Sequence, residues 1–279
     1  MPSNKTTIKV FLTSCIILIF YCQGFASEHS YTFRISGSGS GLASIRPIIT
    51  EFNKQNPDIN IQVLPSTGTT GGILALMDDA IDLSIAARPL SPEEQKLDIV
   101  WQPYGSTVIA FTVHSKAEVT STSEAEIVDI LSGKITHWPD GSYIRLVMRS
   151  SRESDFIPVI NHNNKLAKAL KEGLSRTDVI FSSTAEDNIE ILQSLPGSLG
   201  LTSLAQLQSE QTTLKPLMYN NIAPTLKNLN NGSYPFHKTF FLVYKKHLLS
   251  TALKSFVDFI LSNQACNILK ANGQACRGA

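Results

Sequence analysis

The stretch Ser66-Thr67-Gly68-Thr69-Thr70-Gly71-Gly72 lies between an alternating apolar run, Ile59 to Leu64, and a helix-like segment that begins near Ile73. A loop of small residues that leaves a strand and opens a helix gathers free backbone N–H groups, hydroxyl donors and the positive end of the helix dipole. Such a loop suits a bound anion. We therefore expect the fold to be organised around strand–loop–helix units of this kind.

A second loop of the same type lies upstream. Ser36-Gly37-Ser38-Gly39-Ser40-Gly41 follows the strand-like run Tyr31 to Ile35 and precedes an apolar helical run from Leu42. From Tyr31 to Leu90 the pattern reads β-α-β-α-β, which predicts a parallel sheet. Loops that follow parallel strands meet at the carboxyl edge of the sheet, where ligands bind in such folds. We expect the two loops to converge on one ligand.

The overall composition is that of a globular chain with a local binding site. The 279 residues are 42% hydrophobic and 17% charged, which is enough apolar content for one or two cores. A formal net charge of +1 and the lack of a basic run interleaved with aromatics argue against a nucleic-acid partner. His114, His137 and His237 lie on different segments without metal-ligand spacing, so we expect no metal and no cofactor.

The N-terminus is typical of a targeting segment. Lys5 and Lys9 precede an apolar run, Val10 to Tyr21, that is short for a membrane span, and Gly24-Phe25-Ala26 then supplies small residues where a signal peptidase reads them. We expect residues 1–26 to be a signal peptide that is cleaved after the alanine. The mature chain is then expected in the periplasm.

The four cysteines divide into two groups. Cys15 and Cys22 belong to the targeting segment, and a lipoprotein anchored through Cys22 is the alternative, although the two residues before it are bulky where a lipobox has small ones. Cys266 and Cys276 remain close together near the C-terminus. In an oxidising compartment such a pair is expected to form a disulfide, because a metal site would need further ligands and no histidine lies nearby.

The second half of the chain contains a third loop of interest. Thr107 to His114 is an apolar strand that can carry the chain into a second lobe. Glu124 to Leu131 reads as an amphipathic helix with Ser123 as its N-cap in a capping box. The strand-like run Tyr143 to Met148 then leads to Arg149-Ser150-Ser151-Arg152-Glu153-Ser154-Asp155.

These loops, their order and the phrases around them resemble the phosphate-binding proteins of bacterial ABC importers, the periplasmic (type II) kind. Six phrases span nearly all of the mature chain: Ile35-Ser36-Gly37-Ser38-Gly39-Ser40, Gly68-Thr69-Thr70-Gly71-Gly72, Ile81-Asp82-Leu83-Ser84-Ile85-Ala86-Ala87-Arg88-Pro89-Leu90, Ile130-Leu131-Ser132-Gly133-Lys134-Ile135-Thr136-His137-Trp138, Pro196-Gly197-Ser198-Leu199-Gly200 and Ser233-Tyr234-Pro235. No one phrase is specific, but six in this order are.

The resemblance implies an α/β fold with two lobes hinged by two crossovers, each lobe a mixed, mostly parallel sheet flanked by helices. The ligand is expected in the cleft between the lobes. We expect residues 27–110 and 219–279 to form lobe 1 and residues 111–218 to form lobe 2. Thr213 to Met218 is expected to carry the chain back, and a final helix is expected from about Leu249 to Lys270.

For lobe 1, the resemblance implies that the anion binds against the loop that contains Ser38, Ser40 and Gly41. The N–H groups of Gly41 and Leu42 are the implied donors. The anion would next contact the second loop at Thr69, whose hydroxyl and N–H groups match those of the family's serine, with Thr70 beside it.

For lobe 2, the family's arginine corresponds to Arg149, which offers a charge-assisted contact to an oxyanion. The family's serine-glycine-threonine donors correspond to Glu153, Ser154 and Asp155. Closure of the lobes would then bury the ligand.

The chain departs from the family pattern at three positions. Many phosphate binders have an aspartate or serine where this chain has Ala87, and that aspartate can accept the proton of monohydrogen phosphate, which sulfate lacks. Glu153 and Asp155 replace neutral donors with acceptors, and a buried carboxylate beside a dianion is costly unless it is protonated or paired. Three explanations stay open: Glu153 or Asp155 supplies the missing acceptor, Arg152 pairs with one of them outside the pocket, or the ligand is not phosphate.

Three candidates also have plainer interpretations. Arg149 is alternatively a solvated surface arginine. Arg88 is expected to lie at the hinge or in the cleft rather than to contact the ligand. Thr69 is expected to cap its helix in any case, because capping and anion binding use the same N–H groups.

The expected function is capture of phosphate or a related oxyanion for an inner-membrane ABC permease, by a monomeric binding protein that is not an enzyme. Use of the same fold for sensing or adhesion is one alternative. A secreted phosphoester hydrolase is another, but Gly37-Ser38-Gly39-Ser40-Gly41 has glycine where a nucleophile elbow has serine, and no metalloprotease motif occurs.

Overall fold

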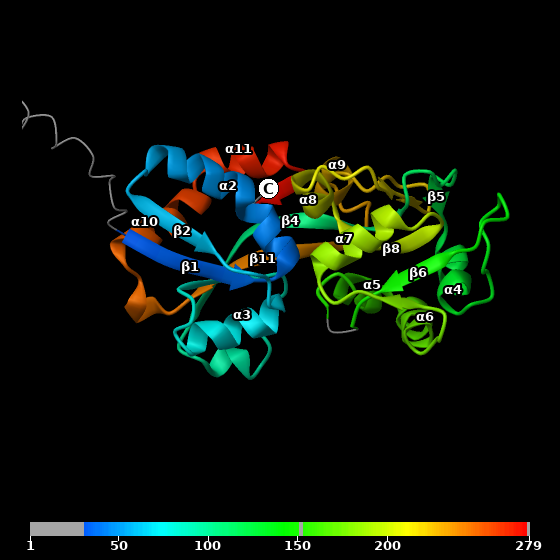
Figure 1. The fold of residues 1–279 in the computed structure, drawn as a ribbon, viewed down its shortest axis with the longest axis horizontal. Helices are drawn as coiled ribbons and strands as arrows, with labels where there is room; N and C mark the ends of the chain where they lie inside the picture. The colour runs from blue at the N-terminus through cyan, green and yellow to red at the C-terminus, as the bar shows by residue number, and fades with distance from the viewer. Residues whose placement is uncertain (1–30, 151–152, 278–279) are drawn as a thin grey trace, which may run out of the picture.

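The computed structural model describes residues 31–150 and 153–277. The predicted signal peptide, its cleavage site and Cys22 lie outside the described residues. Within those ranges no helix has the length and apolar character needed to cross a bilayer. Figure 1 shows two lobes side by side, one containing both ends of the described chain (blue, orange and red) and the other its middle (green and yellow).

The elements alternate between strands and helices, as the spacing predicts. In chain order they are β1 (Tyr31–Gly37), α2 (Gly39–Gln55), β2 (Ile59–Val63), α3 (Gly68–Met77), β3 (Leu83–Ala86), η1 (Glu94–Lys96), β4 (Val100–Val113), β5 (Ser121–Thr122), α4 (Glu124–Leu131), β6 (Arg145–Met148), α5 (Ile157–His162), α6 (Asn164–Leu174), β7 (Ile180–Phe181), α7 (Ala185–Ser194), β8 (Ser198–Ser203), α8 (Leu204–Ser209), β9 (Lys215–Pro216), β10 (Met218–Tyr219), α9 (Leu226–Asn230), β11 (His237–Tyr244), η2 (Lys246–Leu248), α10 (Thr251–Ile260), α11 (Asn263–Ala271) and β12 (Gln274–Cys276).

One sheet path runs through both lobes in the order β2-β1-β3-β11-β4-β8-β6-β7. The outer pairs in each lobe are parallel, with Ile35 of β1 opposite Val63 of β2 and Leu83 of β3. The central pairs around β11 and β4 are antiparallel. The predicted class, a mixed α/β fold with parallel strands flanked by helices, is confirmed.

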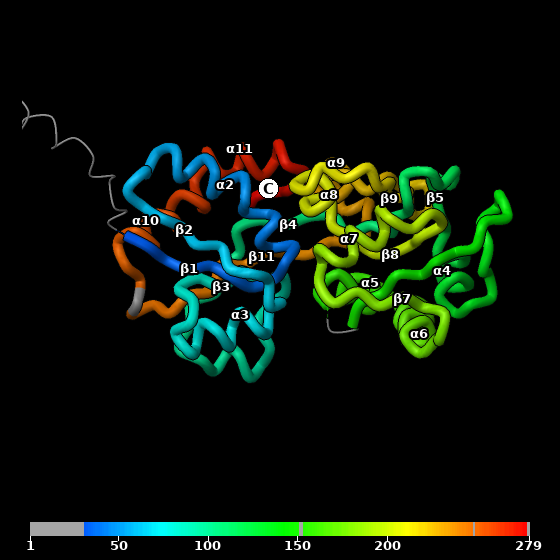
Figure 2. Tube along the Cα trace, viewed as in Figure 1, coloured from blue at the N-terminus to red at the C-terminus, as the bar shows by residue number. Residues whose placement is uncertain are grey.

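The long strand β4 connects the lobes. Its first part pairs with β11 and β12, and its second part, from Ile109, pairs with β8. Figure 2 shows the chain passing between the lobes along β4 and β11. Any group on these two strands near the crossing therefore lies close to both lobes.

Each lobe has its own core. The first cluster includes Ile35, Phe52, Tyr104, Phe240 and Phe256, all nearly or fully buried. The second cluster includes Val108, Phe111, Leu146, Leu170, Tyr219 and Phe236. Packing therefore changes between Tyr104 and Val108 and again between Phe236 and Phe240, so the chain returns to the first core on β11. The lobe boundaries at 110/111 and 218/219 stay predictions from sequence. The run Thr213 to Met218, which the sequence predicts to carry the chain back, contains β9, and β9 pairs with the part of β4 that lies in the second lobe.

Local capping explains several helix ends. Ser123 caps α4 in the predicted capping box, with Ser123 Oγ accepting from Glu126 N. The expected single C-terminal helix is instead two helices, because Ser262 interrupts it and caps α11 by accepting from Ala265 N at 3.2 Å. The predicted disulfide is confirmed: Cys266 of α11 is bonded to Cys276 of β12.

Candidate functional site

The two glycine-rich loops lie against each other at the carboxyl ends of β1 and β2. Thr67 N donates to Gly37 O at 3.1 Å, and the hydroxyls of Ser36 and Thr67 are 3.4 Å apart. This approach needs glycine: a Cβ on Gly72 would lie 2.6 Å from Gly37 Cα, and Gly37 itself has φ +130°. The loops that the sequence predicts to converge do so in the structure.

A cavity of about 310 Å³ lies between the lobes where these loops end. The residues that line it come from both lobes: Ser38, Gly39, Ser66, Thr67, Gly68, Thr69, Thr70 and Arg88 from the first, and Arg149, Glu153, Ser154, Ser183 and Thr184 from the second. Six of the ten predicted ligand residues are among them. Hydroxyl groups dominate the wall, and within the described residues Glu153 is its one carboxylate.

Three helices begin at this cavity. Ser38 is the N-cap of α2, Thr67 of α3 and Thr184 of α7. The first N–H groups of a helix have no partner within the helix and carry the positive end of its dipole. Backbone donors from both lobes therefore face one space, which suits an anion.

The predicted lobe 1 donors are arranged differently from the expectation. Gly41 N donates to Ser38 Oγ at 3.4 Å and Leu42 N to Ser38 O at 2.8 Å, so both N–H groups are engaged within the helix cap. Ser40 does not line the cavity but lies behind Ser38, with their Oγ atoms 3.1 Å apart.

Thr69 is not a helix cap. The N-cap is Thr67, and Thr69 is the second residue of α3, with its Oγ1 accepting from Ala87 N at 3.1 Å. Ala87 itself is buried, and its side chain offers no acceptor. The hydroxyl of Thr69 is therefore held at the cavity wall with its own hydrogen free to donate.

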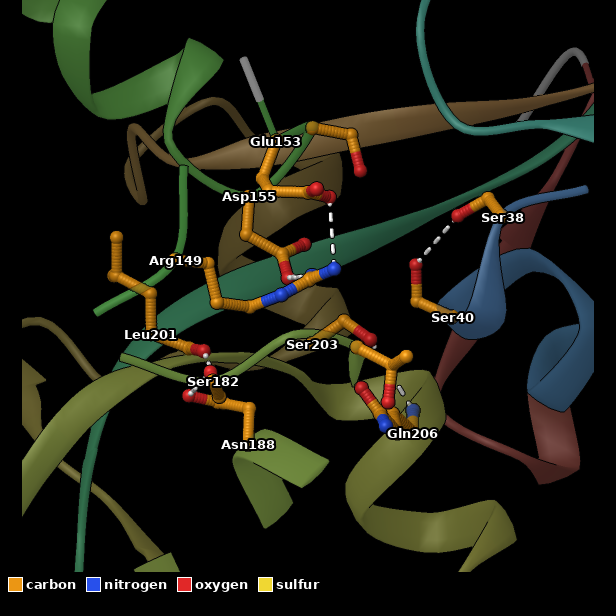
Figure 3. A network of polar contacts seen from close by, with 12 residues as sticks. Ser38, Ser40, Arg149, Glu153, Asp155, Ser182, Asn188, Leu201, Ser203 and Gln206 are labelled. Atoms are coloured by element: carbon orange, nitrogen blue, oxygen red, sulfur yellow. Dashed lines mark hydrogen bonds and ion pairs between the residues drawn. The ribbon is translucent and has the colours of Figure 1, made fainter. Parts of the chain in front are cut away.

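Arg149 is buried rather than a solvated surface arginine. It is 8% exposed, and it follows the last residue of β6 directly. Its Nη2 lies 2.9 Å from Glu153 Oε2, and its Nη1 lies 3.7 Å from Asp155 Oδ2 (Figure 3). Its Nε has no hydrogen-bond partner among the described residues. A buried, unsatisfied N–H of a guanidinium is a donor in need of an acceptor.

The two unexpected carboxylates have different partners. Glu153 pairs with Arg149 and lines the cavity, and burial raises its pKa although the Arg149 charge opposes the rise. Asp155 is 2% exposed, does not line the cavity, and forms an ion pair with Lys238 of β11. The idea that Arg152 pairs with either of them lies outside the described residues.

Arg88 lines the cavity, but its charge is already paired. Its Nη1 and Nη2 lie 2.7 and 2.8 Å from the two carboxylate oxygens of Glu94, and Nη2 also donates to Thr70 Oγ1 at 2.9 Å. Arg88 thus positions Thr70 at the wall. No group of three or more potential metal ligands occurs among residues 31–150 and 153–277.

A family model described as a PBP superfamily domain matches residues 24–264. The chain belongs to the PBP superfamily.

Individual relatives of this PBP superfamily member are distant but nearly as long as the chain. It is 23% identical to the phosphate-binding protein PstS of Borreliella burgdorferi over 97% of this chain and 98% of the relative. Its fold is similar to a putative phosphate ABC transporter substrate-binding protein with bound phosphate from Clostridium perfringens, with TM-score 0.74 and 23% identity over 88% of this chain and 99% of that one. An ABC-type phosphate transport receptor from Vibrio cholerae gives TM-score 0.61 at 19% identity, over 87% and 99%.

Several residues of this PBP superfamily site were not predicted. Ser183 and Thr184 had a readable signal, because Thr184-Ala185-Glu186-Asp187 is a capping-box sequence at the start of a helix. Lys238 had none, since a lysine at the start of an apolar strand is ordinarily solvated. Glu186 also had none, yet Ser66 Oγ of the first lobe lies 3.5 Å from its Oε2.

Proposed function

We propose that this chain captures phosphate or a related oxyanion between its lobes and delivers it to an inner-membrane ABC permease. The observation that carries the proposal is the cavity itself, where hydroxyl and backbone donors from α2 and α3 face a buried arginine across the gap. The names of the relatives, and the phosphate bound to the Clostridium perfringens protein, support the same ligand class.

The donor set favours a small, highly charged oxyanion over an organic solute. Ser38, Thr69, Thr70 and Ser154 offer short hydroxyl donors, and Arg149 offers a planar cation with an unsatisfied Nε. Tetrahedral oxyanions use many donors in a small volume, whereas sugars and peptides need acceptors as well. We assign these five residues as ligand contacts.

The charge of the site favours an oxyanion that carries a proton. At the cavity wall, Arg149 is paired with Glu153, and Arg88 is paired with Glu94. Behind the wall, Lys238 is paired with Asp155, so these pairs leave no excess of positive charge around the ligand. Glu153, at the cavity wall, is placed to accept a proton of the ligand, which replaces the acceptor missing at Ala87. Monohydrogen phosphate has such a proton and sulfate does not.

The names of the relatives, which are binding proteins, support a binding role rather than a catalytic one. Among the described residues that line the cavity there is no histidine or cysteine. Ser66 has the Glu186 carboxylate 3.5 Å away, but within the described residues its hydroxyl has no hydrogen bond to a histidine or lysine. We infer a periplasmic, monomeric binding protein. Sensing with the same fold stays an alternative, and it is distinguished by whether deletion of the chain abolishes phosphate uptake or leaves it unchanged.

Calorimetric titration with phosphate, arsenate, sulfate and methylphosphonate tests the proposal. We expect saturable 1:1 binding of phosphate and arsenate, with sulfate much weaker. Turnover of p-nitrophenyl phosphate is measured in parallel on the same preparation and should be absent. The proposal fails if no oxyanion binds, or if a phosphoester is hydrolysed and Ser38→Ala stops the reaction.

A further inference from the structure

Lys238 is a buried cation at the junction of the two lobes. It lies at the second position of β11, one of the two strands that connect the lobes, and it is 4% exposed. Its Nζ donates to Ser40 Oγ of α2 at 2.6 Å, to Ser154 Oγ at 3.4 Å, and to Asp155 Oδ1. An ammonium group has three donors and no acceptor. All three of its hydrogens are therefore used, and none is left for a ligand.

The ammonium group fixes the direction of the hydroxyls beside it. Ser40 Oγ must accept from Lys238, so its own hydrogen is available for another acceptor, and Ser38 Oγ at 3.1 Å is the one found among the described residues. Ser38 Oγ also accepts from Gly41 N. With both lone pairs of Ser38 used, its hydroxyl can act only as a donor.

Ser38 lines the cavity, whereas Ser40 and Lys238 do not. We propose that Lys238 is a positioning residue that, through Ser40, makes the Ser38 hydroxyl an obligate donor into the anion cavity. Without the hydrogen bonds from Lys238 to Ser40 and from Ser40 to Ser38, the Ser38 hydroxyl could accept a hydrogen bond as well as donate one. A hydroxyl whose oxygen faces the cavity as an acceptor would repel an anion. This inference rests on the proposed capture of an oxyanion.

The Lys238 ammonium group also pairs with the Asp155 carboxylate, which would otherwise compete with the ligand for Arg149. Asp155 Oδ1 pairs with Lys238, while its Oδ2 lies 3.7 Å from Arg149 Nη1. If Lys238 were neutral, the buried Asp155 carboxylate would have Arg149 as its one remaining cation within these contacts. Lys238 thus leaves Arg149 available to the ligand.

The direct test is Ser40→Ala, which removes the hydroxyl that links Lys238 to Ser38 without changing a residue of the cavity wall. We expect phosphate affinity, measured by calorimetry, to fall by about 3- to 10-fold. The melting temperature should fall as well, because one hydrogen of the buried Lys238 ammonium group loses its acceptor, so affinity is compared at a temperature where both proteins are folded. The double variant Ser38→Ala/Ser40→Ala should bind no more weakly than Ser38→Ala alone, because Ser40 acts on the ligand only through the Ser38 hydroxyl, which Ser38→Ala has already removed. Wild-type affinity in Ser40→Ala, or additive losses in the double variant, would overturn the inference.

A second set of variants tests Lys238 itself. Lys238→Met should lower phosphate affinity by roughly 30-fold or more, and adding Asp155→Asn should recover part of that loss because no carboxylate then competes for Arg149. Lys245→Met is the matched control, since Lys245 is a buried lysine just after β11 that pairs with Asp79, away from the cavity. Equal losses in Lys238→Met and Lys245→Met would assign Lys238 a merely structural role. Should Lys238→Met not fold, the two serine variants still decide.

The two proposals fail in different ways. If wild-type protein binds no oxyanion, the proposed function is wrong. If wild-type protein binds phosphate but Ser40→Ala binds it equally well, the proposed function stands and the role of Lys238 is wrong.

Discussion

Arg149 Nη2 lies 2.9 Å from Glu153 Oε2, so the guanidinium that would hold an anion already has a carboxylate beside it in the same cavity. The residues are four apart, on the loop that links β6 to α5. An anion that binds to Arg149 therefore also lies close to the Glu153 carboxylate. The affinity of the site for an anion depends on both the Arg149 cation and the Glu153 carboxylate.

Arg149→Ala should weaken phosphate binding by about 30-fold or more. Removing one partner from a desolvated charge contact commonly costs about 2 to 5 kcal/mol. Calorimetric titration measures the change. Arg145→Ala is the control, because Arg145 is the first residue of β6, the strand that Arg149 directly follows, but donates to Pro196 O at the surface. Equal affinities in wild type and Arg149→Ala would remove Arg149 from the site.

Glu153→Gln should narrow the preference for phosphate over sulfate by about tenfold. An ionised carboxylate can accept the proton of monohydrogen phosphate but repels every oxygen of sulfate, whereas the amide can donate to sulfate. Competition titrations at roughly neutral pH give the ratio of the two affinities, and a second pair of titrations at higher pH favours the ionised carboxylate, because burial raises the pKa of Glu153. An unchanged ratio would show that Glu153 does not face the ligand.

Asp178→Asn should lower stability at neutral pH and have no effect in strong acid. Asp178 accepts from Arg176 Nε at 2.9 Å, from Arg176 Nη2 at 2.6 Å and from Tyr143 Oη at 2.7 Å. These bonds, those from Arg176 first, hold the Asp178 pKa below its usual value. The stabilisation is therefore present above the ordinary carboxyl pKa and lost as pH falls through the lowered one. Because the side chain is partly exposed, we expect Asp178→Asn to lower the free energy of unfolding by about 0.5 to 1 kcal/mol at roughly neutral pH. Urea unfolding of both proteins across a range of pH measures this difference. A difference that grows as the pH falls would contradict the prediction.

The variant Cys266→Ser/Cys276→Ser should lower the free energy of unfolding by about 2 to 3 kcal/mol, as the loop-closure relation gives for a loop of about ten residues. The bond ties α11 to β12, and β12 pairs with the first part of β4. Urea unfolding with and without reductant measures the difference. Reductant should lower the stability of wild type to that of the double variant and leave the variant itself unchanged.

Most of the fold could be predicted from sequence because its signals are local. Alternating apolar runs followed by glycine-rich loops predict β1, α2, β2 and α3, and Ser123 predicts the start of α4. The return to the first lobe was harder to predict. Both Thr213 to Met218 and the run that contains β11 read as strands, and it is the packing of Tyr219 and Phe236 in the second core that places the crossing on β11.

The site could be predicted only where its residues follow one strand or begin one helix. Ser38, Thr69 and Arg149 satisfy that condition, and the cavity brings them together. Lys238 is 83 residues from Asp155 and 198 from Ser40, so no spacing relates them. The sequence therefore showed two unexplained carboxylates without the lysine that compensates one of them.

A crystal structure of the protein grown with phosphate tests directly whether the interlobe cavity holds the anion. We expect one phosphate in this cavity, within hydrogen-bond distance of the Ser38 and Thr69 hydroxyls and of Arg149. Phosphate bound elsewhere, or a cavity that still lacks the anion at a concentration that saturates binding in solution, would contradict this expectation.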